Sequence, residues 1–212
     1  LFRDRNYVFF NALRNEKGFI DSLDFKVNGE FVKDVESWVS LSVMKTAENL
    51  KDDYYYDYYN KAGEKIYAGY NTDQTKADSI RYEPGYIPRP SDQRVTFSMF
   101  FQDYVPRIPS LKMSLNLVFG SGLPFGPPDN ARYKDILRMT EYRRVDIGFS
   151  YLLKKEGQEL RKMNPFKYCK SAWIGLDVFN LLGINNTVSY LWIKDISNRQ
   201  YGIPNYLSAR LI

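Results

Sequence analysis

The sequence has no histidine, only one cysteine and no long apolar run, and each shortage narrows what the chain can be. Without histidine, a catalytic triad lacks its usual base and a metal centre lacks its commonest ligand. Cys169 alone cannot form an internal disulfide, so we expect a small interior or turn residue rather than a nucleophile. No run approaches the ~18 apolar residues of a spanning helix, which excludes helical membrane proteins but not β-barrels. These absences predict a protein that is not an enzyme, with no metal site and no cofactor.

Charge of one sign is not concentrated anywhere along the chain. The net charge is +5 over 212 residues, and lysine and arginine are scattered. Because nucleic-acid binding proteins carry basic stripes or patches, we expect no nucleic-acid partner. The sequence begins at Leu1 with no methionine and no signal-like segment, which indicates an internal fragment or a processed product. Aromatics are abundant, with 18 Tyr, 14 Phe and 3 Trp, and these residues suit strands and membrane-interface belts.

Alternation of apolar and polar residues dominates the chain and is clearest in the stretch Arg94–Phe119. There Val95 and Phe97 alternate with Thr96 and Ser98, and the pattern resumes after a short turn. Since side chains on a strand point to opposite faces in turn, this hairpin has one apolar and one polar face. The same alternation predicts seven strands, near residues 18–31, 37–46, 94–105, 110–120, 142–153, 171–181 and 203–212.

The connections between these strands alternate in length. Long ones are expected at Ala47–Asp92, Gly120–Thr140 and Leu181–Tyr201, and shorter turns at Val32–Glu36, Val105–Ser110 and Lys154–Lys170. The first long connection has little apolar periodicity, and irregular loops of that length are usually functional or disordered. Strands of about ten residues exceed the ~5–6 typical of soluble proteins and match the ~9–11 that cross a bilayer.

Two all-β architectures fit this pattern. An antiparallel meander with long loops on one side and short turns on the other is typical of an outer-membrane barrel. A soluble antiparallel sandwich gives the same alternation, so periodicity cannot separate the two. Strand length and the asymmetry of the connections favour the barrel.

Nine short segments are similar in sequence to segments of one protein family, and they occur in the same order along the chain as in that family. They are Lys17–Phe19, Asp24–Phe31, Glu36–Trp38, Arg89–Arg94, Phe119–Pro124, Tyr142–Ile147, Asp177–Leu182, Val188–Tyr190 and Ile203–Arg210. They resemble the late strands of TonB-dependent outer-membrane receptors of the Bacteroidota type. No one segment is decisive, but together they span nearly the whole chain.

The resemblance implies the last ~7 strands of a transmembrane β-barrel of about 22 strands, filled by an N-terminal plug. No segment here resembles the plug or the TonB-contacting box, so the seven strands would be part of a larger barrel. The long loops would be extracellular and the short turns periplasmic. The implied partners are outer-membrane lipid, the plug and remaining strands, the TonB–ExbB–ExbD system and a possible surface lipoprotein.

The function implied by the resemblance is active uptake of an extracellular ligand, such as a siderophore, glycan or peptide, across the cell outer membrane. A second hypothesis is an outer-membrane barrel without transport, acting as an adhesin or as an accessory subunit of a surface assembly. A third, less favoured, is a soluble β-sandwich binding module.

A run of tyrosines in the first long connection is the candidate ligand contact. Such rings can stack on a sugar, a siderophore or a peptide, although a loop can also pack its own aromatics. The residues are Tyr54, Tyr55, Tyr56, Tyr58 and Tyr59. Nearby Asp52, Asp53, Asp57 and Asn60 offer oxygens to Ca²⁺, but they lack the spacing of a calcium loop, so we expect solvated charges.

Charged residues on the polar faces of the strands form a second predicted set. In a barrel these residues would face the lumen, where they would pair with one another or with the plug, or would line the substrate path. They are Asp24, Lys26, Glu30, Lys112, Arg144, Asp146, Asp177 and Arg210. Aromatic residues near strand ends are candidates for interfacial girdles: Trp38, Tyr104, Tyr151, Trp173 and Tyr206.

Overall fold

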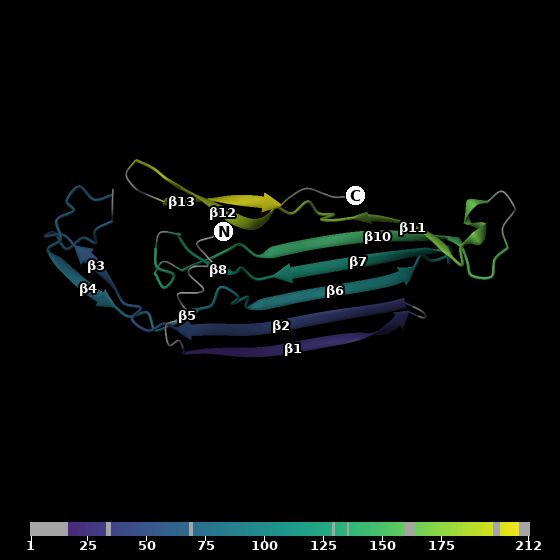
Figure 1. The fold of residues 1–212 in the computed structure, drawn as a ribbon, viewed down its shortest axis with the longest axis horizontal. Helices are drawn as coiled ribbons and strands as arrows, with labels where there is room; N and C mark the ends of the chain where they lie inside the picture. Colours follow the sequence, from purple (N-terminus) through teal and green to yellow (C-terminus); the bar gives the residue numbers. More distant parts are fainter. Residues whose placement is uncertain are drawn as a thin grey trace.

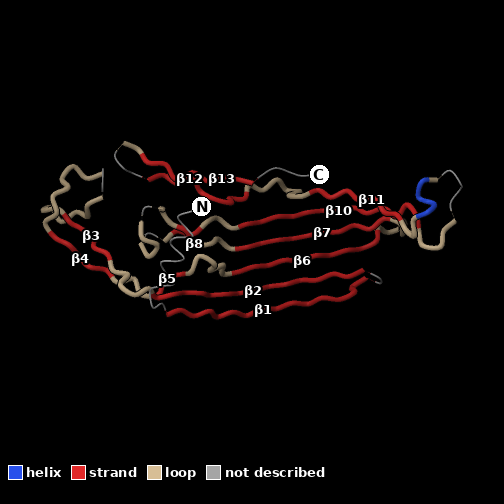
Figure 2. Tube along the Cα trace, viewed as in Figure 1, coloured by secondary structure: helices blue, strands red, loops and turns tan. Residues whose placement is uncertain are grey.

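The structure, a computed structural model, is built from antiparallel β-strands (Figures 1 and 2). It describes residues 17–32, 35–67, 70–128, 130–134, 136–159, 164–196 and 200–207. The largest sheet has the strand order β1-β2-β6-β7-β10-β11, and β5 pairs with β2. Its strands are β1 (Lys17–Val32), β2 (Val35–Asn49), β5 (Tyr86–Pro88), β6 (Val95–Tyr104), β7 (Leu111–Gly120), β10 (Tyr142–Lys154) and β11 (Ala172–Val178). The prediction of an all-β antiparallel fold is confirmed.

Three two-stranded sheets lie outside the large sheet, and all of their strands except β13 fall in the predicted long connections. They are β3 (Tyr55–Tyr59) with β4 (Asp78–Tyr82), β8 (Pro124–Phe125) with β9 (Leu137–Arg138), and β12 (Asn186–Lys194) with β13 (Gln200–Leu207). The seven predicted strands did not include β3, β4, β8, β9 or β12. Aromatic residues favour strands, but a run of tyrosines has no contrast between apolar and polar positions, so alternation does not reveal it.

The predicted final strand at residues 203–212 also needs correction. The structure places β13 at Gln200–Leu207 and pairs it with β12 rather than with β11. Residues 208–212 lie outside the described residues. The other six predicted ranges agree with β1, β2, β6, β7, β10 and β11 to within three residues at either end. Alternation assigns the two faces of a strand but not its neighbour in the sheet, so the pattern alone could not assign this strand its partner.

The register of the large sheet separates its residues into two faces. Residues opposite each other in an antiparallel pair lie on the same face. On one face Leu41 lies opposite both Phe25 and Phe97. On the other face Asn116 lies opposite Asp146. The two-faced hairpin predicted from alternation is thus continued across six strands.

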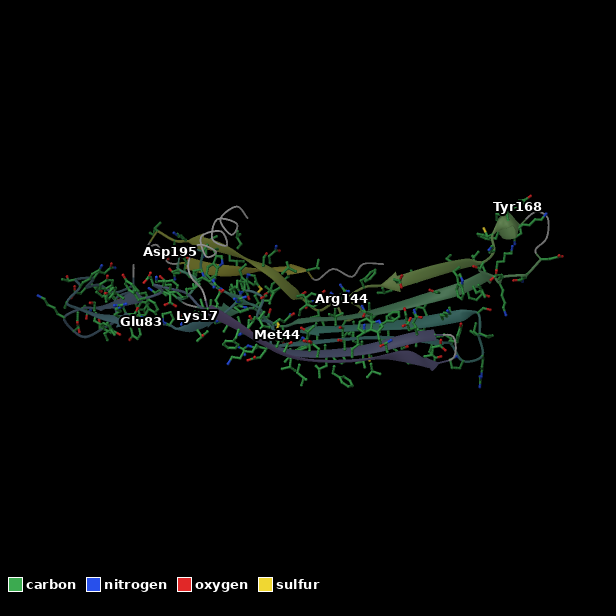
Figure 3. All side chains as sticks on the ribbon, turned by 60° about the horizontal axis from the view of Figure 1, so that its bottom comes forward. Lys17, Met44, Glu83, Arg144, Tyr168 and Asp195 are labelled. Atoms are coloured by element: carbon green, nitrogen blue, oxygen red, sulfur yellow. The ribbon has the colours of Figure 1, made fainter. Side chains whose placement is uncertain are left out.

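The apolar face of the large sheet carries no second layer in the described part of the chain. Leu23 is 74% exposed and Leu176 is 54% exposed, and side chains of β1 and β2 extend freely from the sheet (Figure 3). Polar residues of the other face, such as Thr46 and Asp146, are buried instead. No sandwich is formed by the described residues. The sheet also stays open, with β1 and β11 as its edge strands.

The two ends of the large sheet differ in their connections, as expected (Figure 1). One end carries β3–β4, β8–β9 and the β12–β13 hairpin. The other carries the short β1–β2 and β6–β7 turns and the β10–β11 turn, which holds a 3-10 turn at Pro165–Tyr168. Buried Lys154 holds that turn by donating to the carbonyl oxygens of Phe166, Lys167 and Cys169 at 3.1, 2.7 and 2.6 Å. In the described residues, no helix has the length and apolar character to cross a membrane.

Candidate functional site

The predicted tyrosine contact forms a hairpin, β3–β4, at the end of the sheet that carries the long connections (Figure 1). Strand alternation puts Tyr54, Tyr56 and Tyr58 on one face of this hairpin. Register places Arg81 opposite Tyr56 on that same face. The structure therefore brings the five predicted tyrosines together but divides them between two faces.

The face with Tyr54, Tyr56 and Tyr58 is open, and these side chains are 42%, 41% and 36% exposed. The rings of Tyr54 and Tyr56 meet edge to face at 5.9 Å, and those of Tyr56 and Tyr58 stack at 6.4 Å. A cation lies at each end of this row. Arg81 is 4.1 Å from the centroid of Tyr54, and the Lys76 amine is 3.9 Å from that of Tyr58. We call these three tyrosines the tyrosine row.

The opposite face of the hairpin is anchored. Tyr55 stacks on Tyr82 at 5.6 Å and on Tyr133 of the β7–β10 connection at 6.3 Å. Buried Asp57 accepts a hydrogen bond of 2.5 Å from the Lys65 amine, and this bond raises the pKa of Lys65 although partial burial opposes it. A hydrogen bond with Tyr82, followed by desolvation, raises the pKa of Tyr59 above 10.0. One face thus fixes the hairpin while the other meets solvent.

Two of the oxygen-bearing residues beside the tyrosines, Asp57 and Asn60, have structural uses in this hairpin. Asp57 is occupied by Lys65. Asn60 is buried and its side-chain oxygen accepts from the backbone N–H groups of Ala62 and Glu64, closing the turn after β3. Within the described ranges, no group of three or more acidic, Cys or His side chains is arranged to hold a metal ion.

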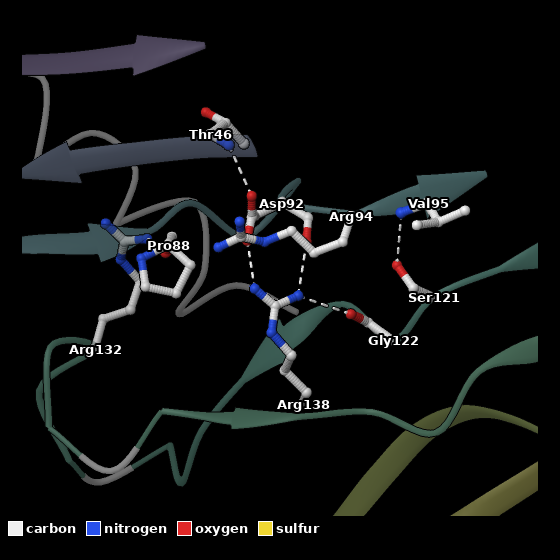
Figure 4. A network of polar contacts seen from close by, with 9 residues as sticks. All are labelled: Thr46, Pro88, Asp92, Arg94, Val95, Ser121, Gly122, Arg132 and Arg138. Carbon is white, nitrogen blue, oxygen red and sulfur yellow. Dashed lines mark hydrogen bonds and ion pairs between the residues drawn. The ribbon is translucent and has the colours of Figure 1, made fainter. Parts of the chain in front are cut away.

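We call the end of the large sheet that carries the long connections the rim. A buried carboxylate, Asp92, is its central polar group, and sequence reasoning did not single it out (Figure 4). Asp92 is fully buried. Its Oδ1 accepts from the Thr46 N–H at 2.7 Å, and its Oδ2 accepts from Arg94 Nε at 2.8 Å and from Arg138. Arg138 also donates to the carbonyl oxygens of Asp92 and Gly122, at 2.9 and 3.1 Å.

Several effects compete in setting the pKa of Asp92. Burial favours the neutral form and is the largest single effect. The hydrogen bond from Thr46 and the charges of Arg138 and Arg94 outweigh burial together, so the pKa lies below its ordinary 3.8. Asp92 is therefore ionised at neutral pH and ties β2 to both long connections that flank β6 and β7.

The same connection that carries Arg138 also reaches the hairpin. Arg132 pairs with buried Glu48 of β2 and donates to the Pro88 carbonyl at 3.4 Å. Tyr133 stacks on Tyr55, and the Lys134 amine lies 5.4 Å from the centroid of the same ring. We call Arg132, Tyr133, Lys134 and Arg138 the brace, because together they join the hairpin to the rim of the sheet.

The brace depends on contacts between residues that are far apart in the sequence, so sequence patterns gave little indication of it. Arg89–Arg94 was noted only as a segment of the family resemblance. The usable signal was an aspartate two residues from an arginine directly before a strand, a spacing that allows a local ion pair. Arg138 is 46 residues further on, and no local pattern relates it to Asp92.

Six of the eight residues predicted to face a lumen lie on the polar face of the large sheet, as the register shows. Register places Asp24, Lys26, Lys112, Arg144, Asp146 and Asp177 there. Glu30 lies past the last regular pair of β1, at an irregularity in the register, and is exposed. Arg210 lies outside the described residues.

Two of these polar-face charges, Arg144 and Asp146, pair with each other. Buried Asp146 accepts from Arg144 Nε at 3.0 Å, from the Asn116 side chain at 3.0 Å and from the Asn180 N–H at 2.9 Å. Lys112 instead lies over the rings of Tyr104 and Trp173, 5.2 and 5.0 Å from their centroids. These contacts are favourable because the face of an aromatic ring attracts a cation.

Comparisons with protein-family models, with curated proteins and with solved structures found no match to this chain. Its function must therefore be argued from two features of the structure. The first is a sheet with one uncovered apolar face. The second is a rim that holds an open row of tyrosines.

Proposed function

We propose that this chain forms part of the wall of a TonB-dependent outer-membrane receptor. The observation that carries the proposal is the uncovered apolar face of a sheet in which polar residues such as Thr46 and Asp146 are buried. A soluble protein exposes no apolar surface that extends across six strands, because its contact with water is unfavourable. Contact with lipid tails removes that cost and leaves the other face for polar side chains.

Strand length and hydrogen bonding fit the same proposal. The strands β6 and β7 have 10 residues each and β10 has 13, against about 9–11 needed to cross a bilayer at a tilt. In hydrocarbon every backbone N–H and C=O needs a partner, so a sheet must close. The edges of β1 and β11 would then pair with further strands beyond those described.

The family resemblance supplies the transport step of the proposal. An extracellular ligand would bind the outer connections and the plug, and energy transmitted by TonB would open a path through the barrel. In that scheme the large sheet forms part of the barrel wall. The contacts of Asp146 with Arg144, Asn116 and Asn180 hold the polar face of the sheet, which would face the lumen. The tyrosine row, on the open face of β3–β4, is the contact that this chain offers to the ligand.

The lone cysteine gives a direct test of orientation. Cys169 is exposed in the β10–β11 turn, at the end proposed to be periplasmic. In intact cells making the full-length protein, we expect no reaction of Cys169 with a large membrane-impermeant maleimide. Reaction should follow permeabilisation of the outer membrane. In a Cys169→Ser background, Thr72→Cys in the β2–β6 connection should react in intact cells.

Labelling of Cys169 in intact cells, or a water-soluble protein that fractionates without detergent, would refute the membrane orientation. Uptake is tested separately, by comparing accumulation of a bound ligand in cells with and without TonB. Loss of accumulation without TonB is expected. Surface exposure with unchanged accumulation would point to the second hypothesis, a barrel that binds but does not transport.

A further inference from the structure

The β10–β11 turn, Lys154–Lys170, is a fixed structure at the end of the sheet opposite the rim. The side-chain oxygen of Asn164 accepts from the Phe166 N–H at 3.0 Å, and the Phe166 carbonyl accepts from the Cys169 N–H at 3.1 Å. The buried Lys154 amine donates to three carbonyl oxygens of the turn and so ties it to the end of β10. The turn is therefore held in place where it projects past the ends of β6 and β7 (Figure 1).

Most of what this turn exposes is positive charge. Every residue from Pro165 to Ser171 is exposed, and Tyr168 is 91% exposed. Between Lys154 and Lys170 the sequence has six cations and two carboxylates, in a chain whose whole net charge is +5. The turn is thus a local exception to the even scatter of charge along the chain.

The other two turns at this end show that joining strands requires neither this length nor this charge. The β6–β7 turn, Val105–Ser110, has six residues and a single cation, Arg107. The lysines of the long turn also lack acidic partners. Within the ranges that the structure describes, no ion pair is formed by Lys155, Lys167 or Lys170. Their amines are therefore available to a partner from outside the chain.

Charge and size together restrict that partner. Several amines on one short turn attract a polymer that repeats its negative charges, because each further contact is made at high effective concentration. A protein partner needs about 20–30 residues on each side and a well-packed centre. A segment that lies in a membrane surface needs an apolar face. From Asn164 to Ser171 the turn has one large wholly apolar side chain, Phe166, so a charged polymer fits it best.

From these observations we infer that the β10–β11 turn binds the carboxylates of the peptidoglycan layer. The inference rests on the orientation in the proposed function, which places this turn in the periplasm. Peptidoglycan carries carboxylates on short peptides and joins those peptides to chains of sugars. The amines of Lys155, Lys167 and Lys170 pair with the carboxylates. The ring of Tyr168, whose centroid is 5.5 Å from the Lys167 amine, packs against a neighbouring sugar.

The test is co-sedimentation of purified, detergent-solubilised full-length protein with isolated peptidoglycan sacculi. We expect binding that weakens as salt is raised and is lost when the sacculus carboxylates are converted to neutral amides. Replacing Lys155, Lys167 and Lys170 together by glutamine should weaken binding by about tenfold. Tyr168→Ala should weaken it by about threefold.

The matched control makes the same change of net charge at the other end of the sheet. It replaces three exposed lysines by glutamine and should leave binding unchanged: Lys51, Lys61 and Lys194. Heat-modifiable mobility checks that each variant is folded. Soluble competitors identify the source of the anionic group. Disaccharide–tetrapeptide fragments of peptidoglycan should release the protein, whereas glycerophosphoglycerol, the headgroup of an anionic phospholipid, should not.

Four results would each overturn the inference. They are no sedimentation with sacculi, unchanged binding in the lysine variant of the turn, an equal loss in the control variant, and release by the phospholipid headgroup as readily as by the peptidoglycan fragment. Sedimentation of purified protein does not depend on how the protein lies in the membrane. A failure here is therefore distinct from a failure of the orientation test with Cys169.

Discussion

Replacing Met99 by arginine is expected to prevent most of the full-length protein from assembling in the outer membrane. Met99 lies near the middle of β6 on the apolar face, opposite Val39 and Leu117. An arginine facing lipid at the bilayer midplane costs a barrel about 2–4 kcal/mol. The amount of heat-modifiable, folded protein in outer-membrane fractions measures the effect.

The neighbouring residue provides the matched control. Ser98 has the opposite orientation and lies across from Ser40 and Val118 on the polar face. Arginine at Ser98 should reduce assembly far less, because its charge can reach water or a polar partner. If the apolar face met water instead of lipid, Met99→Arg would change stability by no more than about 0.5 kcal/mol. Equal assembly of the two variants would therefore disprove a lipid-facing sheet.

Replacing Asp92 by asparagine is expected to release the brace from the rim. The substitution removes the negative charge that Arg94 and Arg138 share, and it leaves two guanidinium groups without that partner. Breaking a buried ion pair costs about 3–5 kcal/mol, and partial exposure of both arginines brings our expectation to about 2–3 kcal/mol. Amide hydrogen exchange should speed up in the β7–β10 connection and in β3–β4.

Asp78 provides the comparison for Asp92. It is exposed on β4 and bonds only locally, to the N–H of Ser79 at 2.7 Å among its described contacts. Asp78→Asn should alter exchange by less than about 0.5 kcal/mol. If Asp92→Asn accelerated exchange no more than this control, the buried carboxylate would not be what holds the connections together.

The stability provided by Asp92 should depend on pH in one direction. Its pKa is lower in the folded protein than its ordinary 3.8, so the folded state favours the ionised form. The contribution is complete above that ordinary value and is lost as the pH falls through the folded pKa. The protection factors of amides in the β7–β10 connection, which compare each exchange rate with its unfolded rate at the same pH, should therefore be constant near neutrality and fall only under acid conditions below about pH 4. Asp92→Asn should remove this dependence.

Much of the large sheet followed from the sequence because the signal is local. Alternation along Arg94–Phe119 and its repeats defined the strand faces, and the lengths of the connections predicted that the two ends of the sheet would differ. The β3–β4 hairpin was missed for the same reason. The tyrosines of β3 alternate with one another, so no contrast marked β3 as a strand.

The sequence by itself determined an all-β antiparallel chain whose sheet is apolar on one face and polar on the other, because side-chain direction reverses at every residue of a strand. Only the tertiary structure decided that the apolar face stays uncovered and that Asp92 joins the rim. Thr46 and Arg138 each lie 46 residues from Asp92, and only pairing between strands brings such distant groups within bonding distance.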